Sequence, residues 1–493
     1  MPLTVLTDSD VRNLLLQLTK QDILSLQQSL ADALHYYSTA TEEDSSNACS
    51  SSYQPLRTSL KRGDGQTTLF MPASSNDGMG IKIVTLAGAD KTNQSNASSS
   101  ASATSSLSSL SISAQSSTSS TPTLDTKQSS VSSAQSTTPK GSLTLLDPTG
   151  APRALLNAEE ITAFRTALAS TMLFKKRQNV HDVVVFGAGK QAYWHIRLAL
   201  LLRGPDIHHL NIINRNFERV HQLISTLYSP YQEAHKWDAH ESNHGHHGPT
   251  GSTDTSLARP KIQILTPHHG EYDRLLKATI RASSVIFCTT PSLNPLFPAQ
   301  FLTNPEGRKK GRYLAAIGSY QPHMVEIHPD ILRQNVAPEQ GRHFHKHASQ
   351  GGAVVVDSVE ACLKEAGEMI QAGLGPNEVV EIGELVMLKK DAERRRAECN
   401  ARRSEEGFDE TGVELGECEK TKNKKKKKEK KGATKDKDGE SDDDKAHKSL
   451  MEWLQRGNVV YKSVGLGLMD VVVGMDLVRL ADERGIGTKI QDF

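Results

Sequence analysis

The stretch that most constrains the fold is VVVFGAGKQA at residues 183–192. An apolar run, long enough for a buried strand, leads into two glycines, and a helix-like segment follows them. Gly187 permits a tight turn, Gly189 leaves the backbone open to a pyrophosphate group, and Ala192 allows close packing of helix on strand. The pattern predicts a dinucleotide site. An ordinary glycine turn between a strand and a helix is the alternative.

Strands and helices alternate after this turn. Further apolar strand candidates lie at residues 210–213, 261–265, 285–290, 313–318 and 353–357. Such alternation is typical of a parallel sheet covered by helices. We therefore predict a Rossmann domain over residues 175–388.

The segment before this domain predicts an α+β unit. Residues 3–37 carry two short helical patterns, the first capped by Thr7, and residues 53–86 alternate as strands around glycine turns. Order returns at residue 143 with a hairpin. A helix follows, with Asn157 as its cap and Glu160 as the capping partner.

The C-terminal segment, residues 449–493, contains one more strand and one more helix. The strand leads into Ser463, which we expect to cap the helix, and Gly485 ends that helix.

Three polar stretches interrupt these units. Residues 88–142 are dominated by Ser and Thr, residues 232–258 are rich in His, and residues 389–448 are mostly charged, with five lysines at 424–428. We expect disordered or solvated insertions, because such compositions bury too little apolar surface to offset chain entropy. Metal binding by the histidines and nuclear import or nucleic-acid binding by the lysines are the alternatives.

Composition narrows the function classes. The net charge of the 493 residues is +1, so no overall field attracts nucleic acid or a membrane. No apolar run approaches the ~20 residues that a membrane span needs, and no secretory signal is evident. The five cysteines are scattered and odd in number, so we expect a cytoplasmic protein without a disulfide framework.

The second dinucleotide signal lies at the end of LNII, where the chain continues with Asn214 and Arg215. Sites that prefer NAD usually carry an acidic residue there for the ribose 2′-hydroxyl, whereas an arginine suits a 2′-phosphate. The sequence therefore predicts NADPH in preference to NADH or NAD. A solvated loop cation is the alternative for Arg215.

A series of stretches resembles the ornithine cyclodeaminase/mu-crystallin family, which includes ketimine reductases and archaeal alanine dehydrogenases. The matching stretches, in order, are LRTSLKR (56–62), LFMPASSNDGMGIKIVT (69–85), ITAFRTALAS (161–170), VVVFGAGKQA (183–192), IINRN (212–216), VIFCTTPSLNPLF (285–297), YLAAIGSYQPHMVEI (313–327), VVVDSVEACLKEAGEM (354–369) and YKSVGLGLMD (461–470).

The resemblance implies the architecture. We expect an α/β protein: a Rossmann NAD(P)-binding domain plus an α+β substrate and dimerisation domain, with long disordered insertions. The α+β domain would comprise residues 1–87 and 143–174 and be completed by 449–493. A homodimer is the expected assembly.

The resemblance also implies the site. Arg57, Lys82 and Arg165 would bind the substrate carboxylate, and Lys82 would exchange protons. A charge within a strand usually faces solvent, which is the alternative for Arg57 and Lys82. The expected cofactor contacts are Gly187, Gly189, Lys190, Gln191, Ala192, Asn214, Arg215, Thr289, Thr290, Ser463 and Gly465.

Two departures from the family pattern shape the predicted activity. Tyr320 stands where the cyclodeaminases carry a catalytic aspartate, and Leu69 stands where they carry an acidic residue that recognises ornithine. These departures favour an NAD(P)H-dependent reductase of cyclic imino acids (ketimines), or an enzyme that interconverts an amino acid and its imine. Tyr320 would be a proton donor in that reaction, with simple packing as its alternative. Conversion of L-ornithine to L-proline and ammonia, and NADPH binding without turnover, are the alternative functions.

Overall fold

The computed structural model describes residues 2–39, 54–55, 57–63, 65–86, 140–229, 257–336, 352–386, 451–491 and 493. Of the three predicted insertions, only residues 140–142 and 257–258 belong to these ranges. Residues 140–142 form the start of a strand, so ordered structure begins slightly before the predicted position 143.

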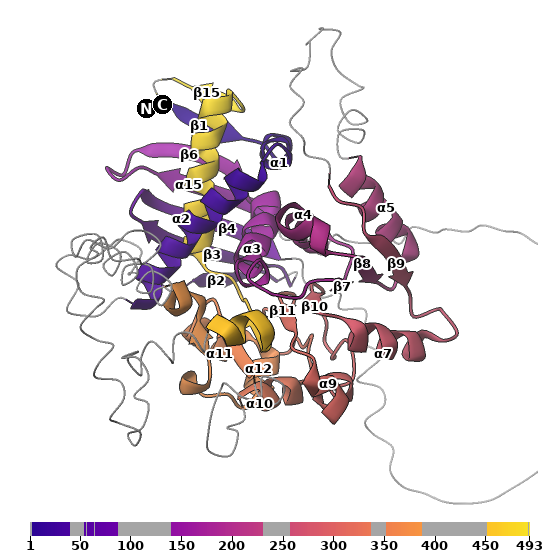
Figure 1. The fold of residues 1–493 in the computed structure, drawn as a ribbon. Helices are drawn as coiled ribbons and strands as arrows, with labels where there is room; N and C mark the ends of the chain where they lie inside the picture. Colours follow the sequence, from indigo (N-terminus) through magenta and orange to yellow (C-terminus); the bar gives the residue numbers. More distant parts are fainter. Residues whose placement is uncertain are drawn as a thin grey trace, which may run out of the picture.

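Two β-sheets, each covered by helices, form the described part of the chain (Figure 1). In spatial order, the strands of the first sheet are β15 (Thr488–Ile490), β1 (Leu3–Leu6), β6 (Pro152–Asn157), β5 (Lys140–Leu146), β4 (Gly78–Leu86), β3 (Thr67–Ser75) and β2 (Thr58–Lys61). Those of the second are β13 (Val380–Glu381), β12 (Gly352–Val356), β14 (Asn458–Lys462), β11 (Tyr313–Ala316), β10 (Val285–Cys288), β7 (Asp182–Phe186), β8 (His209–Ile213) and β9 (Lys261–Leu265).

The first sheet is mainly antiparallel and corrects the prediction at the N-terminus. Residues 3–6 form β1 rather than part of a helix, because β1 pairs with β6 on one side and β15 on the other. Both partners are distant in sequence, so no local pattern reveals the pairing. The first predicted helix is α1 (Asp8–Leu16), and Thr7 forms the expected capping box with Asp10.

Helices cover one face of the first sheet. They are α1, α2 (Lys20–Thr39), α3 (Ala158–Phe174) and α15 (Gly467–Arg484), the long C-terminal helix that packs on β3, β4 and β5 (Figure 1). Gly485 ends α15 at a φ of +66°, as predicted from its position. The opposite face carries the side chains of alternate strand residues, of which Met79 of β4 and Leu155 of β6 are exposed.

The second sheet is parallel throughout, as the alternating pattern predicts. Its helices are α4 (Lys190–Arg203), α5 (Phe217–Tyr228), α7 (Tyr272–Ala282), α8 (Gln300–Thr303), α9 (Pro305–Lys309), α10 (Pro329–Val336), α11 (Val359–Glu365) and α12 (Gly367–Ala372). The strand ends Phe186, Cys288, Ala316 and Lys462 are in register, so the loops that follow them lie at one edge.

The C-terminal segment crosses between the two sheets. Its strand, β14, lies in the parallel sheet between β12 and β11, and only α15 and β15 return to the first sheet. The helix begins at Gly467, so the expectation that Ser463 caps it is wrong. Residues 463–466 instead form an extended connection between the two halves of the molecule.

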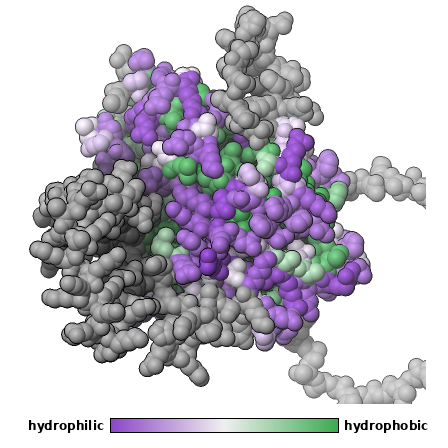
Figure 2. Space-filling model, in the orientation of Figure 1, coloured by the Kyte–Doolittle hydropathy of each residue, from purple (hydrophilic) through white to green (hydrophobic). Residues whose placement is uncertain are grey.

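Apolar side chains of both halves share one core, which includes Leu143 of β5 and Val183 of β7, both almost fully buried. The face of the molecule drawn in Figure 2 is largely hydrophilic over its described residues, with apolar patches between them. No helix in the described ranges is both long and apolar enough to cross a membrane.

Candidate active site

The glycine turn has the conformation that the sequence predicts. Gly187 follows β7 with a φ of +113°, in the region that favours glycine. A Cβ atom on Gly187 would lie 2.8 Å from Oγ1 of Thr289, in the loop after β10. Thr289 in turn donates from Oγ1 to the carbonyl of Phe186 at 2.7 Å. The absence of a side chain at Gly187 therefore lets the two loops meet.

The N-terminus of α4 is open. Gly189 is its N-cap, no side chain caps the helix, and a Cβ atom on Gly189 would meet nothing within 4 Å. Ala192 is fully buried against the core. Free N–H groups at a helix N-terminus attract anions, so this turn fits the pyrophosphate of a dinucleotide.

The first side chains of α4 have neighbours on α3. Nζ of Lys190 lies 2.8 Å from Oε1 of Glu160 and 3.1 Å from Oε1 of Glu159. Oδ2 of Asp8 is 3.6 Å away, so the predicted cofactor contact of Lys190 would have to compete with three carboxylates. Oε1 of Gln191 is buried and without a hydrogen-bond partner in the described structure.

Glu160 does not act as the predicted capping partner. Asn157 caps α3 as expected, but its side chain accepts from the N–H of Glu159. The Glu160 carboxylate instead accepts from Arg12 at 3.0 Å and from the indole N–H of Trp194 at 2.7 Å. Charged and aromatic donors on other helices thus hold Glu160 away from the helix N-terminus.

The residues predicted to face the ribose lie at the end of β8. The backbone N–H of Asn214 donates to the carbonyl of Leu265, and Nδ2 donates to the carbonyl of Asn216 at 2.8 Å. Arg215 is exposed and makes no polar contact with other residues that the structure describes. Its guanidinium is available to an external anion.

A buried cation pair lies where the first sheet meets α15. Nζ of Lys82, on β4, lies 2.9 Å from Oδ1 of Asp470, and Nε of Arg165, on α3, lies 3.2 Å from the same oxygen. Lys82 is 2% exposed, so it does not face solvent. Burial lowers the pKa of Lys82 to about 8; Arg165 and Arg57 also lower it, and Asp470 opposes them.

Arg57 lies near this pair. It is half-buried just before β2 and forms an ion pair with Glu365 at the end of α11. Burial lowers the pKa of its guanidinium, and the charge of Arg165 adds to that effect. The structure therefore brings the three predicted cations into one electrostatic cluster, in which the carboxylates are Asp470, Glu365 and Asp357.

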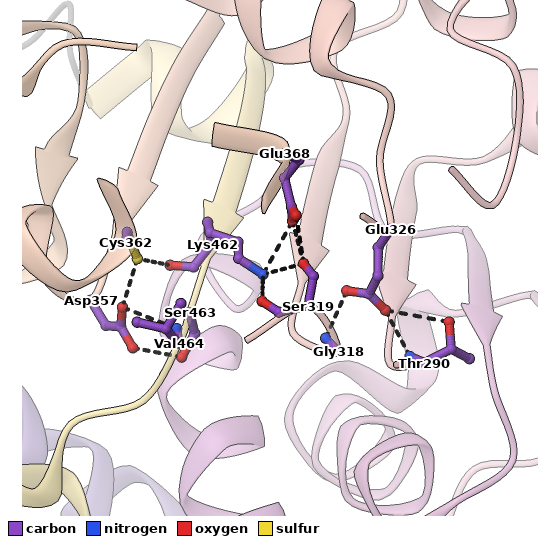
Figure 3. Close-up of polar contacts among 10 residues, drawn as sticks. All are labelled: Thr290, Gly318, Ser319, Glu326, Asp357, Cys362, Glu368, Lys462, Ser463 and Val464. Atoms are coloured by element: carbon purple, nitrogen blue, oxygen red, sulfur yellow. Dashed lines mark hydrogen bonds and ion pairs between the residues drawn. The ribbon is translucent and has the colours of Figure 1, made fainter. Parts of the chain in front are cut away.

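The connection after β14 joins this cluster to the parallel sheet. Gly465 has a φ of +91°, and a Cβ atom there would lie 2.6 Å from Nη2 of Arg165. The Ser463 hydroxyl donates to Oδ2 of Asp357 at 2.7 Å (Figure 3). The Gly465 N–H donates to the same oxygen, also at 2.7 Å. Asp357, which follows β12, thus fixes the path of the chain beside Arg165.

Two further predicted residues lie at the same sheet edge. Thr290 donates its N–H to Oε1 of Glu326 at 2.7 Å. Tyr320 is half-buried after β11, and its hydroxyl makes no hydrogen bond within the described residues. Burial raises the pKa of Tyr320, so the hydroxyl keeps its proton at neutral pH and can donate it.

Sequence reasoning missed the acidic and basic residues that support the site. They share one signal, a charge within or beside a strongly apolar run, and they are Glu326, Asp357, Glu368, Lys462 and Asp470. Each is fully buried. A buried charge requires a partner, but the sequence does not show which residues face one another.

The chain is similar in sequence to several known proteins. No family model matches the chain. An uncharacterised protein of Saccharomyces cerevisiae is 28% identical over 267 residues, 51% of this chain and 64% of that protein, so the chain spans under two thirds of its length. A Delta(1)-pyrroline-2-carboxylate reductase of Bacillus cereus is 20% identical over 448 residues, covering 89% of each chain. The ketimine reductase mu-crystallin of Mus musculus is 22% identical over 51% of this chain and 61% of its own.

Solved structures agree on the fold. The Thermococcus litoralis Delta(1)-pyrroline-2-carboxylate reductase, solved with NADH and L-proline, superposes with a TM-score of 0.55 at 16% identity and covers 99% of this chain and 100% of its own. An archaeal alanine dehydrogenase dimer with bound NAD gives a TM-score of 0.54 at 16% identity and full coverage of both chains. The predicted fold class is confirmed.

Proposed function

We propose that this chain, a member of the ornithine cyclodeaminase/mu-crystallin family, is an NAD(P)H-dependent enzyme that reduces a cyclic imino acid or interconverts an amino acid and its imine. The observation that carries the proposal is the buried Lys82, which shares Asp470 with Arg165. Gly465 and Asp357 link this cluster to the edge that bears the glycine turn.

The chain's residues fit a dinucleotide at that edge. Gly187, Gly189 and the N-terminus of α4 would hold the pyrophosphate, and Thr289 and Thr290 would line the nicotinamide side. When bound there, the cofactor supplies or accepts a hydride at the substrate carbon.

We propose NADPH as the preferred form, because the exposed guanidinium of Arg215 suits a 2′-phosphate. Arg215→Ala should reduce the preference for NADPH over NADH by about tenfold, the size of a lost charge-assisted hydrogen bond. Unchanged NADPH affinity would refute the role of Arg215.

The cation cluster would hold the substrate. Arginine presents a bidentate fork to a carboxylate, so Arg57 and Arg165 are suited to fix the carboxyl group. Substrate would displace Glu365 from Arg57. Lys82, with its pKa lowered to about 8, would give a proton to the imine nitrogen or take one from an amine. The hydroxyl of Tyr320 is a second candidate donor.

One set of assays separates the proposal from its alternatives. Purified protein would receive NADPH with pyrroline-2-carboxylate or piperideine-2-carboxylate, and separately NAD with L-ornithine. Oxidation of NADPH is the expected result. Proline and ammonia formed from ornithine without net change in the cofactor would instead establish a cyclodeaminase. Tight NADPH binding without either reaction would establish a binding protein.

We further propose a homodimer formed through the face of the first sheet opposite its helices. Phe70 of β3 and Ile83 of β4 lie opposite each other in register and alternate with inward residues such as Lys82. Met79 and Leu155 on the same face are 41% and 40% exposed. Ile83→Glu should convert the dimer to a monomer in light scattering; an unchanged mass would exclude this face.

A cytoplasmic location is proposed as well. Cys288 and Cys362 are buried free thiols, which suit a reducing compartment.

A further inference from the structure

A buried carboxylate lies beneath two loops at the cofactor edge. Glu326 follows β11 and is fully buried. Its Oε1 accepts the backbone N–H of Thr290 and its Oε2 accepts that of Gly318, each at 2.7 Å (Figure 3). Thr290 belongs to the loop after β10 and Gly318 to the loop after β11, so one carboxylate connects loops from two neighbouring strands.

Backbone contacts show how closely these loops approach. The N–H of Val325 donates to the carbonyl of Ser292, and the N–H of Leu296 donates to the carbonyl of Glu326, both at 2.8 Å. A Cβ atom on Gly318 would lie 2.1 Å from the carbonyl oxygen of Thr290. The loops therefore pack backbone against backbone, and Glu326 supplies the acceptors for the N–H groups at that contact.

The charges around Glu326 are unbalanced. Lys462 is the cation that faces it, and Nζ of Lys462 lies 3.1 Å from Oε1 of a second buried carboxylate, Glu368. The hydroxyl of Ser319 donates to Glu368, and Lys462 donates to Ser319 (Figure 3). Burial raises the pKa of the nearby Cys288 thiol, and the charge of Glu326 adds to that shift.

The excess of negative charge, together with burial, affects the protonation of Glu326. Burial raises the pKa of Glu326 to about 7; Lys462 opposes the shift, and Glu368 adds to it.

We propose that Glu326 is a positioning residue that fixes the loop after β10 against the loop after β11 and so shapes the nicotinamide side of the cofactor site. The inference rests on the proposed function only in taking a dinucleotide as the ligand of that site. It assigns Glu326 no contact with substrate. Its two oxygens are what matter, because two N–H donors need two acceptors, and a glutamine offers only one beside a donor group.

The test compares Glu326→Gln and Glu326→Asp with a matched control, Glu381→Gln. Glu381 also accepts a backbone N–H at 2.7 Å, that of Val359 at the start of α11, but it lies on the edge strand β13. Hydrogen exchange of the amides in 289–292 and 317–320 is one readout, and affinity for NADPH and NADH is the other.

Glu326→Gln should speed exchange at one or both loops and weaken binding of both dinucleotides, each by about tenfold, as expected for a lost buried hydrogen bond. Glu326→Asp keeps two oxygens but is shorter, so it should give a smaller loss. Glu381→Gln should match the unmodified protein. Exchange and affinity in Glu326→Gln equal to those of the unmodified protein would overturn the proposal.

A second measurement needs no variant and covers the case in which the substitutions fail to fold. Affinity of the unmodified protein for NADH should fall several-fold as the pH drops below about 7, because a protonated Glu326 has only one full acceptor oxygen. NADH is chosen because the 2′-phosphate of NADPH itself titrates near about pH 6. A flat profile from pH 5.5 to 8.5 would overturn the proposal. If Glu326→Gln gives the expected changes in exchange and affinity but the unmodified protein turns over no imino acid, the proposed enzyme function is refuted and the role of Glu326 stands.

Discussion

Two buried lysines in this protein have opposite electrostatic surroundings. Lys82 shares one carboxylate, Asp470, with Arg165 and lies near Arg57, so cations are in excess. Lys462 faces two carboxylates, Glu368 and Glu326, so anions are in excess.

Burial shifts the pKa of one group in each cluster, and the like charges of that cluster add to the shift. The pKa of Lys82 is lowered to about 8, whereas that of Lys462 is raised and Glu326 takes a pKa of about 7. A buried group that lacks its own counter-charge ionises less readily. One cluster therefore yields a proton-exchanging lysine on the substrate side, and the other a titratable carboxylate on the cofactor side.

The largest expected effect comes from removing the lysine of the first cluster. Lys82→Ala should lower kcat for imino-acid reduction by about a thousandfold, within the usual range for loss of a positioned acid–base group. Affinity for NADPH, measured by fluorescence titration, should stay within about twofold, because Lys82 lies in the first sheet. The contrasting variant Lys462→Ala should impair cofactor binding. Equal loss of cofactor binding in both variants would remove the distinction between the clusters.

Removing the shared carboxylate should act mainly on stability. Asp470→Asn leaves Lys82 and Arg165 buried without a counter-charge. Breaking a buried ion pair from one side costs about 3–5 kcal/mol, so a fall of that order in the free energy of unfolding is expected in urea titrations. Glu452→Gln, which removes an exposed pair with Arg456, is the control and should change little. A stability loss below about 1 kcal/mol for Asp470→Asn would contradict the expected dependence on burial.

The two clusters also differ in how far the sequence predicted them. Lys82 and Arg165 followed from the family resemblance, and the strand–glycine–helix pattern gave Gly187 and Gly189 directly. The sequence did not reveal which residues contact them. Asp470 is 388 residues from Lys82, and only the packing of α15 on β4 brings them together.

The same limit applies to the fold. Six of the eight strands of the parallel sheet were predicted, because each is a locally apolar run. The other two were not: β13 has only two residues, and β14 was expected to belong to the first domain. β1 was missed because this short strand is specified by its partners β6 and β15, which lie in distant parts of the chain. Ser463 resembled a helix cap, but Asp357 holds its hydroxyl. Local patterns predict elements well, whereas the identity of a charge partner depends on the tertiary structure.

The pH dependence of the reaction rates tests the role of Lys82 in the unmodified enzyme. The ammonium form of Lys82 is the proton donor for imine reduction, so kcat/KM for reduction should fall about tenfold per unit above pH 8, while amine oxidation should rise. Because the folded pKa lies below the unfolded value of 10.5, the contribution of Lys82 to stability should rise between about pH 8 and 10.5. Steady-state rates of imine reduction and of amine oxidation, measured as a function of pH, test the expected changes in rate. Profiles that change in the same direction would assign the proton transfer to another group.

The smallest expected effect is a shift in the titration of Glu326. Glu368→Gln keeps the shape of the second cluster but removes one of its two negative charges, which leaves Glu326 as the counter-charge of Lys462. The pKa of Glu326 should therefore fall from about 7, and the pH at which NADH affinity declines should move down by about one unit. The infrared band of a protonated carboxyl group reports the same shift without cofactor. Ser319→Ala is the matched control, because it removes a hydroxyl that contacts Lys462 and Glu368 but changes no charge. An equal shift in both variants would mean that packing, rather than the excess of negative charge, sets the protonation of Glu326.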